Sequence, residues 1–290
     1  MEDSATMFEV HRPRLTRLAY QMLGSLAEAQ DMVQDAYLKW HAADRTEVNS
    51  PAAWLTTLVS RLCIDVKRSA RVRREEYVGP WLPEPLLTDE GRSPFDSVEL
   101  ADTLSMAMMR LLEQLTPPER AAFVLHEAFD YAHHEIADIL GKSEAACRQL
   151  LRRAKQRLAE DRPRFQPDPE ERRRLMLRFA QASQAGDLEG LKDMLAADVA
   201  LWSDGGGRVR AALNPIFGAD NVARFMVGTS RKQPPGSAFE IHDVNGEPGF
   251  VGYVDGQPIT TVTFEIVNGK IRGIHMVLNP EKLVGIPPKD

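Results

Sequence analysis

The sequence has only two cysteines, few aromatic residues and no long hydrophobic run. Because it lacks a run of about eighteen apolar residues, it offers no transmembrane helix. Its first residues, MEDSATMFEVHR, are acidic and lack the apolar core of a secretory signal, so we expect a cytoplasmic protein. Cys63 and Cys147 form no CxxC pair and fall on apolar helical positions. They indicate a reducing compartment, where both are expected to be small buried hydrophobes.

The sequence also lacks the motifs of common enzymes. HHEIAD at 133–138 is not the zinc motif HExxH, because Asp138 stands where the second histidine is required. There is no phosphate-binding glycine loop and no nucleophile elbow. We therefore expect that the protein is not an enzyme, with no catalytic residues, no metal and no cofactor.

An excess of positive charge is missing as well. The formal net charge is -6, and residues 1–165 hold more acidic than basic side chains. The basic residues are instead concentrated within 61–74 and 148–164. Two basic patches on an acidic body are expected to bind DNA weakly, unless a larger partner supplies the remaining affinity.

The segment EIADILGKSEAACRQLLRRAKQRL at 135–158 has the pattern of a helix-turn-helix. The first helix is expected to stop at Gly141, since glycine adopts the left-handed conformation at little cost, and Ser143 is a good N-cap for the second. In the second helix an apolar stripe lies opposite a basic face. An amphipathic surface helix with a solvated basic face is the alternative. The turn, the cap and the preceding short helix favour DNA binding.

Proline and glycine divide the chain into segments. We place two helical domains at 1–76 and 97–164, a linker at 77–96 and a third domain at 168–290. The linker contains PWLPEP, which indicates either a segment that docks on another part of the protein or a stiff polyproline spacer. The third domain begins with two helices broken at Gly186. The turn signals NGEPG, DGQ and NGK then predict antiparallel strands. The fold class is therefore multidomain, with two all-α domains followed by an α+β domain.

Residues 27–40 carry apolar side chains at helical spacing, which predicts a buried stripe with an opposite face that includes Asp31, Gln34 and Asp35. Pro51 opens a further helix that runs into the first basic cluster. AEAQDMVQDAYLKW at 27–40 resembles the core-polymerase-binding helix of bacterial extracytoplasmic-function sigma factors. PAAWLTTLVSRLCIDVKRSARVRRE at 51–75 resembles the helix that opens and reads the −10 element. LTPPERAAFVLHEAFDYAHHEIADILGKSEAACRQLLRRAKQRL at 115–158 resembles the −35-binding region.

This resemblance implies that the protein directs transcription initiation in partnership with core RNA polymerase and promoter DNA. Polymerase would supply most of the DNA affinity, which explains the acidic net charge. The residues implied to bind polymerase are Asp31, Gln34 and Asp35, with a solvated acidic face as the alternative. Those implied for the −10 element are Asn49, Trp54, Arg61, Lys67, Arg68 and Arg71. Those implied for the −35 element are Ser143, Glu144, Arg148, Gln149, Arg152, Arg153 and Lys155.

Two details of the −10 region stay open. In the family a flipped −10 base enters a pocket bordered by the loop after the polymerase-binding helix, which corresponds to Asp44–Ser50. Trp54 either stacks on a base or packs in the core, and core packing is favoured.

Residues 170–285 resemble a SnoaL-like domain of the cone-shaped NTF2-like fold, which is fused after the −35 region in sigma factors of the SigJ type. Three short motifs carry this likeness: WLPEP at 81–85, DGGG at 204–207 and NPEKL at 279–283. The resemblance implies regulation in cis, either by holding a compact state that cannot bind polymerase or by stabilising one that can. No dedicated anti-sigma factor is then expected. The implied contact residues are Trp81, Leu82, Pro83, Asp204, Gly205, Gly206, Gly207, Asn279, Pro280, Lys282 and Leu283.

The same cone forms enzymes in other proteins, so a second hypothesis is a DNA-binding regulator whose C-terminal domain is a ketosteroid-isomerase-like enzyme or a small-molecule sensor. A small-molecule ligand in the cone is accordingly a further expected partner. The candidate pocket groups are Trp202, Asp204, His242, Tyr253 and His275. However, Asp204 belongs to the DGGG run, where three glycines indicate a tight turn or a close backbone contact.

Overall fold

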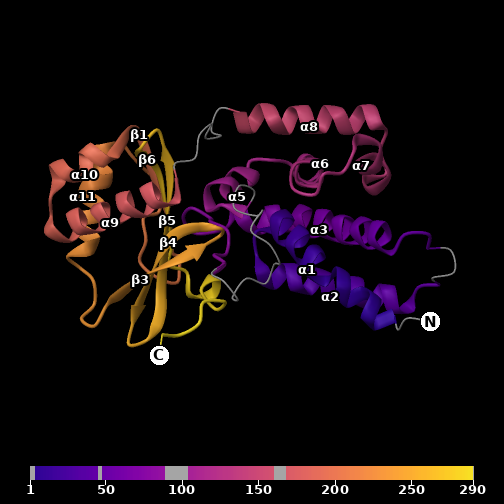
Figure 1. Ribbon diagram of the computed structural model, residues 1–290, viewed down its shortest axis with the longest axis horizontal. Coiled ribbons are helices and arrows are strands. Elements are labelled where there is room, and N and C mark those ends of the chain that lie inside the picture. Colours follow the sequence, from indigo (N-terminus) through magenta and orange to yellow (C-terminus); the bar gives the residue numbers. More distant parts are fainter. Residues whose placement is uncertain (1–3, 45–47, 89–103, 160–167, 290) are drawn as a thin grey trace. The chain divides into compact units, whose positions relative to one another are not determined.

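The computed structural model describes residues 4–44, 48–88, 104–159 and 168–289. These residues form two compact units (Figure 1). The first unit holds residues up to 76 and those from 109 to 159, whereas the second holds 77–88, 104–108 and 168–289. Both helical domains thus lie in one unit, and the linker residues after 76 belong with the C-terminal domain. Over the described ranges, no helix is long and apolar enough to cross a membrane.

The N-terminal half of the first unit consists of three helices that pack on one another. They are α1 (Ser4–Leu23), α2 (Leu26–Ala42) and α3 (Pro51–Glu75). α2 is capped by Ser25, whose hydroxyl accepts a hydrogen bond from the backbone N–H of Glu28 at 3.2 Å. Its buried side is formed by Ala29, Val33, Ala36 and Trp40, which confirms the predicted apolar stripe.

The other half of the first unit contains α6 (Pro117–Glu127), α7 (His133–Leu140) and α8 (Glu144–Ala159). They follow α5 (Met106–Leu112), which begins in the second unit and ends in the first. Thr116 and Glu119 form a capping box at the start of α6. α7 ends at Gly141, whose φ of 62° is the left-handed conformation that the sequence predicted. The helix-turn-helix prediction is thereby confirmed in its local structure.

The second unit is an α+β domain. α9 (Pro169–Ala185) and α10 (Leu188–Met194) are separated at Gly186, as predicted. The strands are β1 (Leu195–Asp204), β2 (Ile216–Phe217), β3 (Ala238–Val244), β4 (Glu247–Val254), β5 (Gln257–Val267) and β6 (Lys270–Val277), with α11 (Ala219–Ser230) between β2 and β3. They form one sheet in the order β2-β1-β6-β5-β4-β3. β1 and β6 pair in parallel, and the other neighbours are antiparallel.

The three predicted turns join β3 through β6 into consecutive hairpins. Each turn is an Asn-Gly or Asp-Gly pair with positive φ at both residues: Asn245-Gly246, Asp255-Gly256 and Asn268-Gly269. A two-residue type I′ turn requires positive φ at both residues, and its twist matches that of the two strands it joins. Local sequence therefore determines where this sheet folds back on itself.

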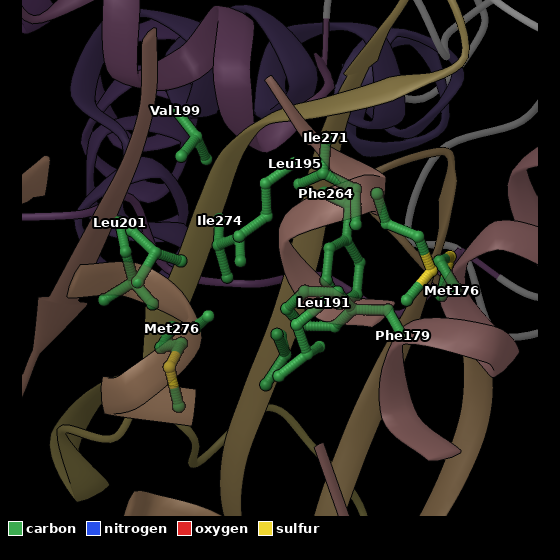
Figure 2. Packing of buried hydrophobic residues seen from close by; sticks show 14 of the residues in the cluster. Met176, Phe179, Leu191, Leu195, Val199, Leu201, Phe264, Ile271, Ile274 and Met276 are labelled. Atoms are coloured by element: carbon green, nitrogen blue, oxygen red, sulfur yellow. The ribbon is translucent and has the colours of Figure 1, made fainter. Parts of the chain in front are cut away.

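The two faces of the sheet bury different parts of the chain. On one face, α9, α10 and α11 pack over a core that includes Phe179, Phe264 and Met276 (Figures 1 and 2). On the other face, Val251 and Val277 of the sheet pack with side chains from the linker, from the start of α5 and from the chain after β6. These covering side chains are Leu82, Leu87, Met106, Leu283 and Ile286. The linker is therefore a segment that docks on the C-terminal domain, as one of the two hypotheses expected, and not a free polyproline spacer.

Candidate nucleic-acid interface and motif cluster

α8 presents its basic face to solvent. Its apolar stripe, Cys147, Leu151, Ala154 and Leu158, is buried, so the opposite side is exposed. Ser143 caps the helix by accepting a hydrogen bond from the backbone N–H of Ala146 at 3.2 Å. All of the side chains predicted to meet the −35 element are exposed: Ser143, Glu144, Arg148, Gln149, Arg152, Arg153 and Lys155.

Some of these residues are already paired within the protein. Arg148 pairs with Glu144 one turn earlier on α8, and Lys155 Nζ lies 2.8 Å from a carboxylate oxygen of Glu127. Over the described ranges, the Arg152 and Arg153 side chains form no ion pair. Arg152 and Arg153 are therefore the arginines of this face that can take a phosphate or a base edge without giving up a partner.

α3 carries most of the residues predicted for the −10 element, but it does not present them equally. Arg68 is exposed beside Asp65, and Asn49 is exposed just before the helix. Trp54 is half-buried, with its ring centroid 5.5 Å from that of Trp40, so it packs against α2. Residues 45–47 of the expected base pocket, and the side chain of Arg71, lie outside the described part of the chain.

Lys67 is buried, unlike Arg68 beside it. Only 6% of Lys67 is exposed, and its ammonium lies 2.8 and 2.9 Å from the two carboxylate oxygens of Glu113. Glu113 also pairs with Arg120, which is fully buried and donates from Nε to the carbonyl of Gln21 at 2.7 Å. Burial lowers the pKa of Arg120 to about 9, which still leaves it charged at neutral pH. These residues form a buried ionic link between the two helical domains.

Two further contacts join the same domains. Arg61 donates from Nε to the carbonyl of Ile139 in α7 at 3.2 Å, and Arg17 donates to the carbonyl of Ala128 at 2.8 Å. In this compact arrangement, Arg61 and Lys67 contact protein at the positions predicted to contact DNA. Sequence reasoning missed Glu113 and Arg120, because nothing local distinguishes them from other charged residues.

The predicted polymerase-binding side chains project together from α2. Asp31, Gln34 and Asp35 are all exposed, on the side opposite the buried stripe. Leu38 lies one turn further along this face and is 57% exposed. Leu38 was not predicted from sequence, although its spacing of three and four residues from Asp35 and Gln34 places it on the same face. A single exposed leucine is common on protein surfaces, so Leu38 gains meaning only from its place beside the predicted polymerase-binding residues.

The three motifs meet at Asp204, the last residue of β1. This carboxylate is fully buried and accepts hydrogen bonds from the Tyr77 hydroxyl at 2.6 Å, the Leu82 backbone N–H at 2.8 Å and the Lys282 ammonium at 2.7 Å. Its backbone carbonyl accepts from the N–H groups of Leu278 and Asn279. One residue of DGGG therefore holds the linker and the NPEKL segment at once.

Lys282 and Asn279 complete this cluster from the NPEKL side. The Lys282 ammonium also donates to the carbonyl of Leu82 and lies 4.1 Å from the ring centroid of Trp81 and 4.9 Å from that of Tyr77. Asn279 donates from its amide to the Tyr77 hydroxyl at 3.0 Å. Desolvation raises the pKa of Tyr77, and its hydrogen bond to Asp204 raises it further. The cluster is a desolvated arrangement of one anion and one cation held by aromatic rings.

The glycines of DGGG allow the close approach that the sequence analysis inferred. A Cβ on Gly206 would lie 2.3 Å from the Asn279 amide nitrogen and 2.8 Å from the Tyr77 hydroxyl, and its φ is +57°. A Cβ on Gly207 would lie 3.2 Å from the Val78 side chain, and one on Gly205 would lie 2.5 Å from the carbonyl of Val209. Side chains at Gly206 and Gly207 would push the linker away, and one at Gly205 would displace the loop itself.

The remaining motif residues surround this centre. Leu82, Pro83 and Leu283 are buried, Trp81 is half-buried and Pro280 is exposed. The linker continues along the edge of the sheet, where Thr88 N–H donates to Asp243 and Asn245 N–H donates to Leu86. Tyr77 was not predicted from sequence. Its position in the glycine- and proline-rich linker, four residues before Trp81, is the signal that could have identified it.

A cavity of about 570 Å³ lies on the other face of the sheet, between the strands and helices α9 and α11. The candidate pocket groups do not line it, so that expectation was wrong. Ser203 faces the cavity, and strand alternation turns its neighbours Trp202 and Asp204 to the opposite face. His275 stacks on Trp202 with ring centroids 5.1 Å apart, Tyr253 packs with the linker cluster, and His242 lies 3.4 Å from Glu240.

Comparison with known proteins agrees with the arrangement of the helical domains. Residues 7–73 match the family described as Sigma-70 region 2, and residues 105–158 match the one described as Sigma-70, region 4. The chain is 38% identical to the ECF RNA polymerase sigma factor SigJ of Mycobacterium tuberculosis, over 98% of this chain and 94% of the relative. It is 31% identical to the probable ECF RNA polymerase sigma factor SigI of the same species, over 95% and 93%.

The likeness extends to the fold of the whole chain. The crystal structure of M. tuberculosis extracytoplasmic function sigma factor SigJ matches with a TM-score of 0.80 and 35% identity, covering 98% of this chain and 100% of that one. A likeness of this length includes both helical domains and the α+β domain. The chain therefore belongs to the ECF RNA polymerase sigma factors of the SigJ type, and its function is to direct transcription initiation.

Proposed function

We propose that this sigma factor is held in a closed state in cis by its C-terminal domain, which acts by fixing the linker at Asp204. The observation that supports this most directly is the burial of the Asp204 carboxylate between Tyr77, Leu82 and Lys282. A buried carboxylate is costly unless it is fully paired, so the linker and NPEKL contacts are needed together. Removing any one of them weakens the others.

Fixing the linker limits how far apart the two DNA-reading domains can move. Residues 77–88 lie along the C-terminal domain. When free, a segment of this length extends by roughly 40 Å, at about 3.3–3.6 Å per residue. Its docking removes that reach, which favours the compact pairing of Lys67 with Glu113. Promoter binding then requires this pairing to open, so that Arg61 and Lys67 can join Arg68 on the −10 DNA.

Core RNA polymerase and promoter DNA are the partners that family membership implies. Polymerase is proposed to bind the exposed α2 surface, which consists of Asp31, Gln34, Asp35 and Leu38. The −35 element is proposed to bind α8 through Arg148, Gln149, Arg152 and Arg153. A protein with this role works in the cytoplasm. Because the closing element is part of the same chain, no dedicated anti-sigma factor is needed.

An isomerase-like activity has less support. In ketosteroid isomerase, the base that abstracts a proton next to a carbonyl is an Asp carboxylate in the substrate cavity. Among the described residues, those that line the cavity include no Asp or Glu. Asp204, the carboxylate considered for this role, is on the opposite face and committed to Lys282 and Tyr77.

Run-off transcription with core RNA polymerase and a library of genomic fragments tests the closed state. Asp204→Asn and Lys282→Met should each raise promoter-specific transcript yield several-fold over the unchanged chain, because each releases the linker. Asp198→Asn is the matched control, since Asp198 lies on the same strand in an exposed pair with Arg272. Yields that stay at the level of the Asp198→Asn control, in variants that remain folded by circular dichroism, would contradict cis inhibition.

A further inference from the structure

We propose that the cavity of the C-terminal domain binds an apolar small molecule with an anionic head group, and that the loop 205–212 passes its presence on to the linker. The second part rests on the proposed cis regulation, whereas the first part stands on the cavity alone. The volume of about 570 Å³ is within the usual range for small-molecule sites, roughly 300–1,000 Å³.

The walls of the cavity are largely apolar. Phe179 and Phe225 contribute from the helices, and Phe250, Phe264 and Met276 from the sheet. Phe264 makes edge-to-face contacts with Phe179 and Phe250, at centroid distances of 5.6 and 6.1 Å, so the aromatic wall is fixed by its own packing. Figure 2 shows Phe179, Phe264 and Met276 within this core. A hydrocarbon body is the complement to such walls.

Among the described residues that line the cavity, the charged side chains are all cationic. Arg210 and Lys232 line it, and both are exposed, so they lie where the cavity opens to solvent. Over the described ranges neither side chain is part of an ion pair. The hydroxyls of Ser183 and Thr229, which also line the cavity, donate hydrogen bonds to backbone carbonyls of their own helices. These two unpaired cations at the mouth of the cavity favour a ligand with an anionic head.

The cavity wall is continuous with the motif cluster on the other side of the sheet. Ser203 and Leu278 line the cavity, and the residues that follow them are Asp204 and Asn279. Arg210, Ala211 and Ala212 line it as well.

The loop that carries these residues touches the linker with its other side. A Cβ on Gly207 would lie 3.2 Å from Val78, and one on Gly79 would lie 3.7 Å from the carbonyl of Ala212. A ligand head held by Arg210 would therefore restrain the same loop that contacts Val78 and Gly79. Because the loop is short, a displacement of its cavity side should also displace the side that faces the linker.

Binding of three probes with one ten-carbon chain tests the ligand class on the full-length protein. Calorimetry with decanoate, decanol and decyltrimethylammonium should give the tightest binding for decanoate and the weakest for the cation. Arg210→Gln should weaken decanoate binding about tenfold and leave decanol unchanged. Arg208→Gln is the matched control, because Arg208 lies two residues away and pairs with Glu281 rather than lining the cavity. Ala180→Phe, which fills the cavity, should abolish binding of both.

Three results would overturn this assignment: no binding of any probe, equal affinity for decanoate and the cation, or an equal loss in Arg208→Gln and Arg210→Gln. None of them depends on transcription, so they are distinguishable from a failure of cis regulation.

The coupling between the cavity and the linker is measured by hydrogen exchange of residues 77–88. Decanoate should change their exchange rate in the unchanged protein and leave it unaltered in Ala180→Phe. An unchanged rate in a protein saturated with decanoate would overturn the coupling.

Discussion

Asp204 illustrates how one buried charge can specify a docking geometry. A buried ion pair adds little net stability, because the desolvation of both ions offsets their attraction, yet removal of one partner costs about 3–5 kcal/mol. The Asp204 carboxylate accepts hydrogen bonds from the Lys282 ammonium, from the Tyr77 hydroxyl and from a backbone N–H of the linker. The linker therefore docks in one register, since any displacement leaves a buried carboxylate short of donors.

Tyr77→Phe should change how stability depends on alkaline pH. The folded protein raises the pKa of Tyr77 above its ordinary value near 10, so the folded state holds a proton that the unfolded state releases. This contribution is complete below about pH 10 and is lost as the pH rises above it. Urea unfolding between pH 8 and 11 should therefore show a steeper loss of stability for the unchanged protein than for Tyr77→Phe. Parallel curves for the two proteins would contradict the assigned hydrogen bond.

At the scale of elements, α2 combines a buried stripe that builds the domain with an exposed face that is free to bind. Leu38→Ala should weaken the affinity for core RNA polymerase by about 1 kcal/mol or more, because an exposed leucine within a contact surface is buried on binding. Val10→Ala on α1 is the control, since Val10 is equally apolar and 75% exposed in the same unit. Pull-down or fluorescence titration with core enzyme measures both. An equal effect of the two changes would remove Leu38 from the interface.

α8 permits a prediction that separates phosphate contacts from base contacts. Arg152→Ala should lower promoter binding by the polymerase complex and reduce the slope of log affinity against log salt by about one, if Arg152 neutralises one phosphate. Arg224→Ala on α11 removes the same charge from an exposed pair with Asp220 in the C-terminal domain. Its salt slope should match that of the unchanged protein. A loss in Arg152→Ala that varies with −35 sequence, at an unchanged slope, would assign Arg152 to base reading instead.

For the whole molecule, the proposed cis regulation depends on whether the two helical domains can separate. Fluorescence energy transfer between dyes on Lys39→Cys in α2 and Gln156→Cys in α8 reports this distance, since both positions are exposed. Cys63 and Cys147 are buried and burial raises the pKa of both thiols, so they should not react with the dyes. Transfer should be high in the unchanged protein and lower after Asp204→Asn or after core polymerase is added. Equal transfer in all three would mean that linker docking does not govern separation.

Local sequence determined much of this protein. Gly141 and Gly186 end helices because they adopt positive φ at little cost, and the Asn-Gly and Asp-Gly pairs fold the sheet into hairpins for the same reason. The apolar stripes of α2 and α8 follow from helical spacing, so their exposed faces could be named in advance. Each of these features is decided by residues within about one turn or one hairpin of each other.

Tertiary structure alone decided which groups meet. The sequence placed Asp204 in the motif that touches the linker, but its neighbours Tyr77 and Lys282 lie 127 and 78 residues away. Lys67 was expected on DNA and is buried against Glu113, because burial depends on which helices pack together. Trp202 and Asp204 were expected in the cavity, and Ser203 lines it instead. Along a strand, a difference of one residue changes the face, and sequence does not say which face the helices cover.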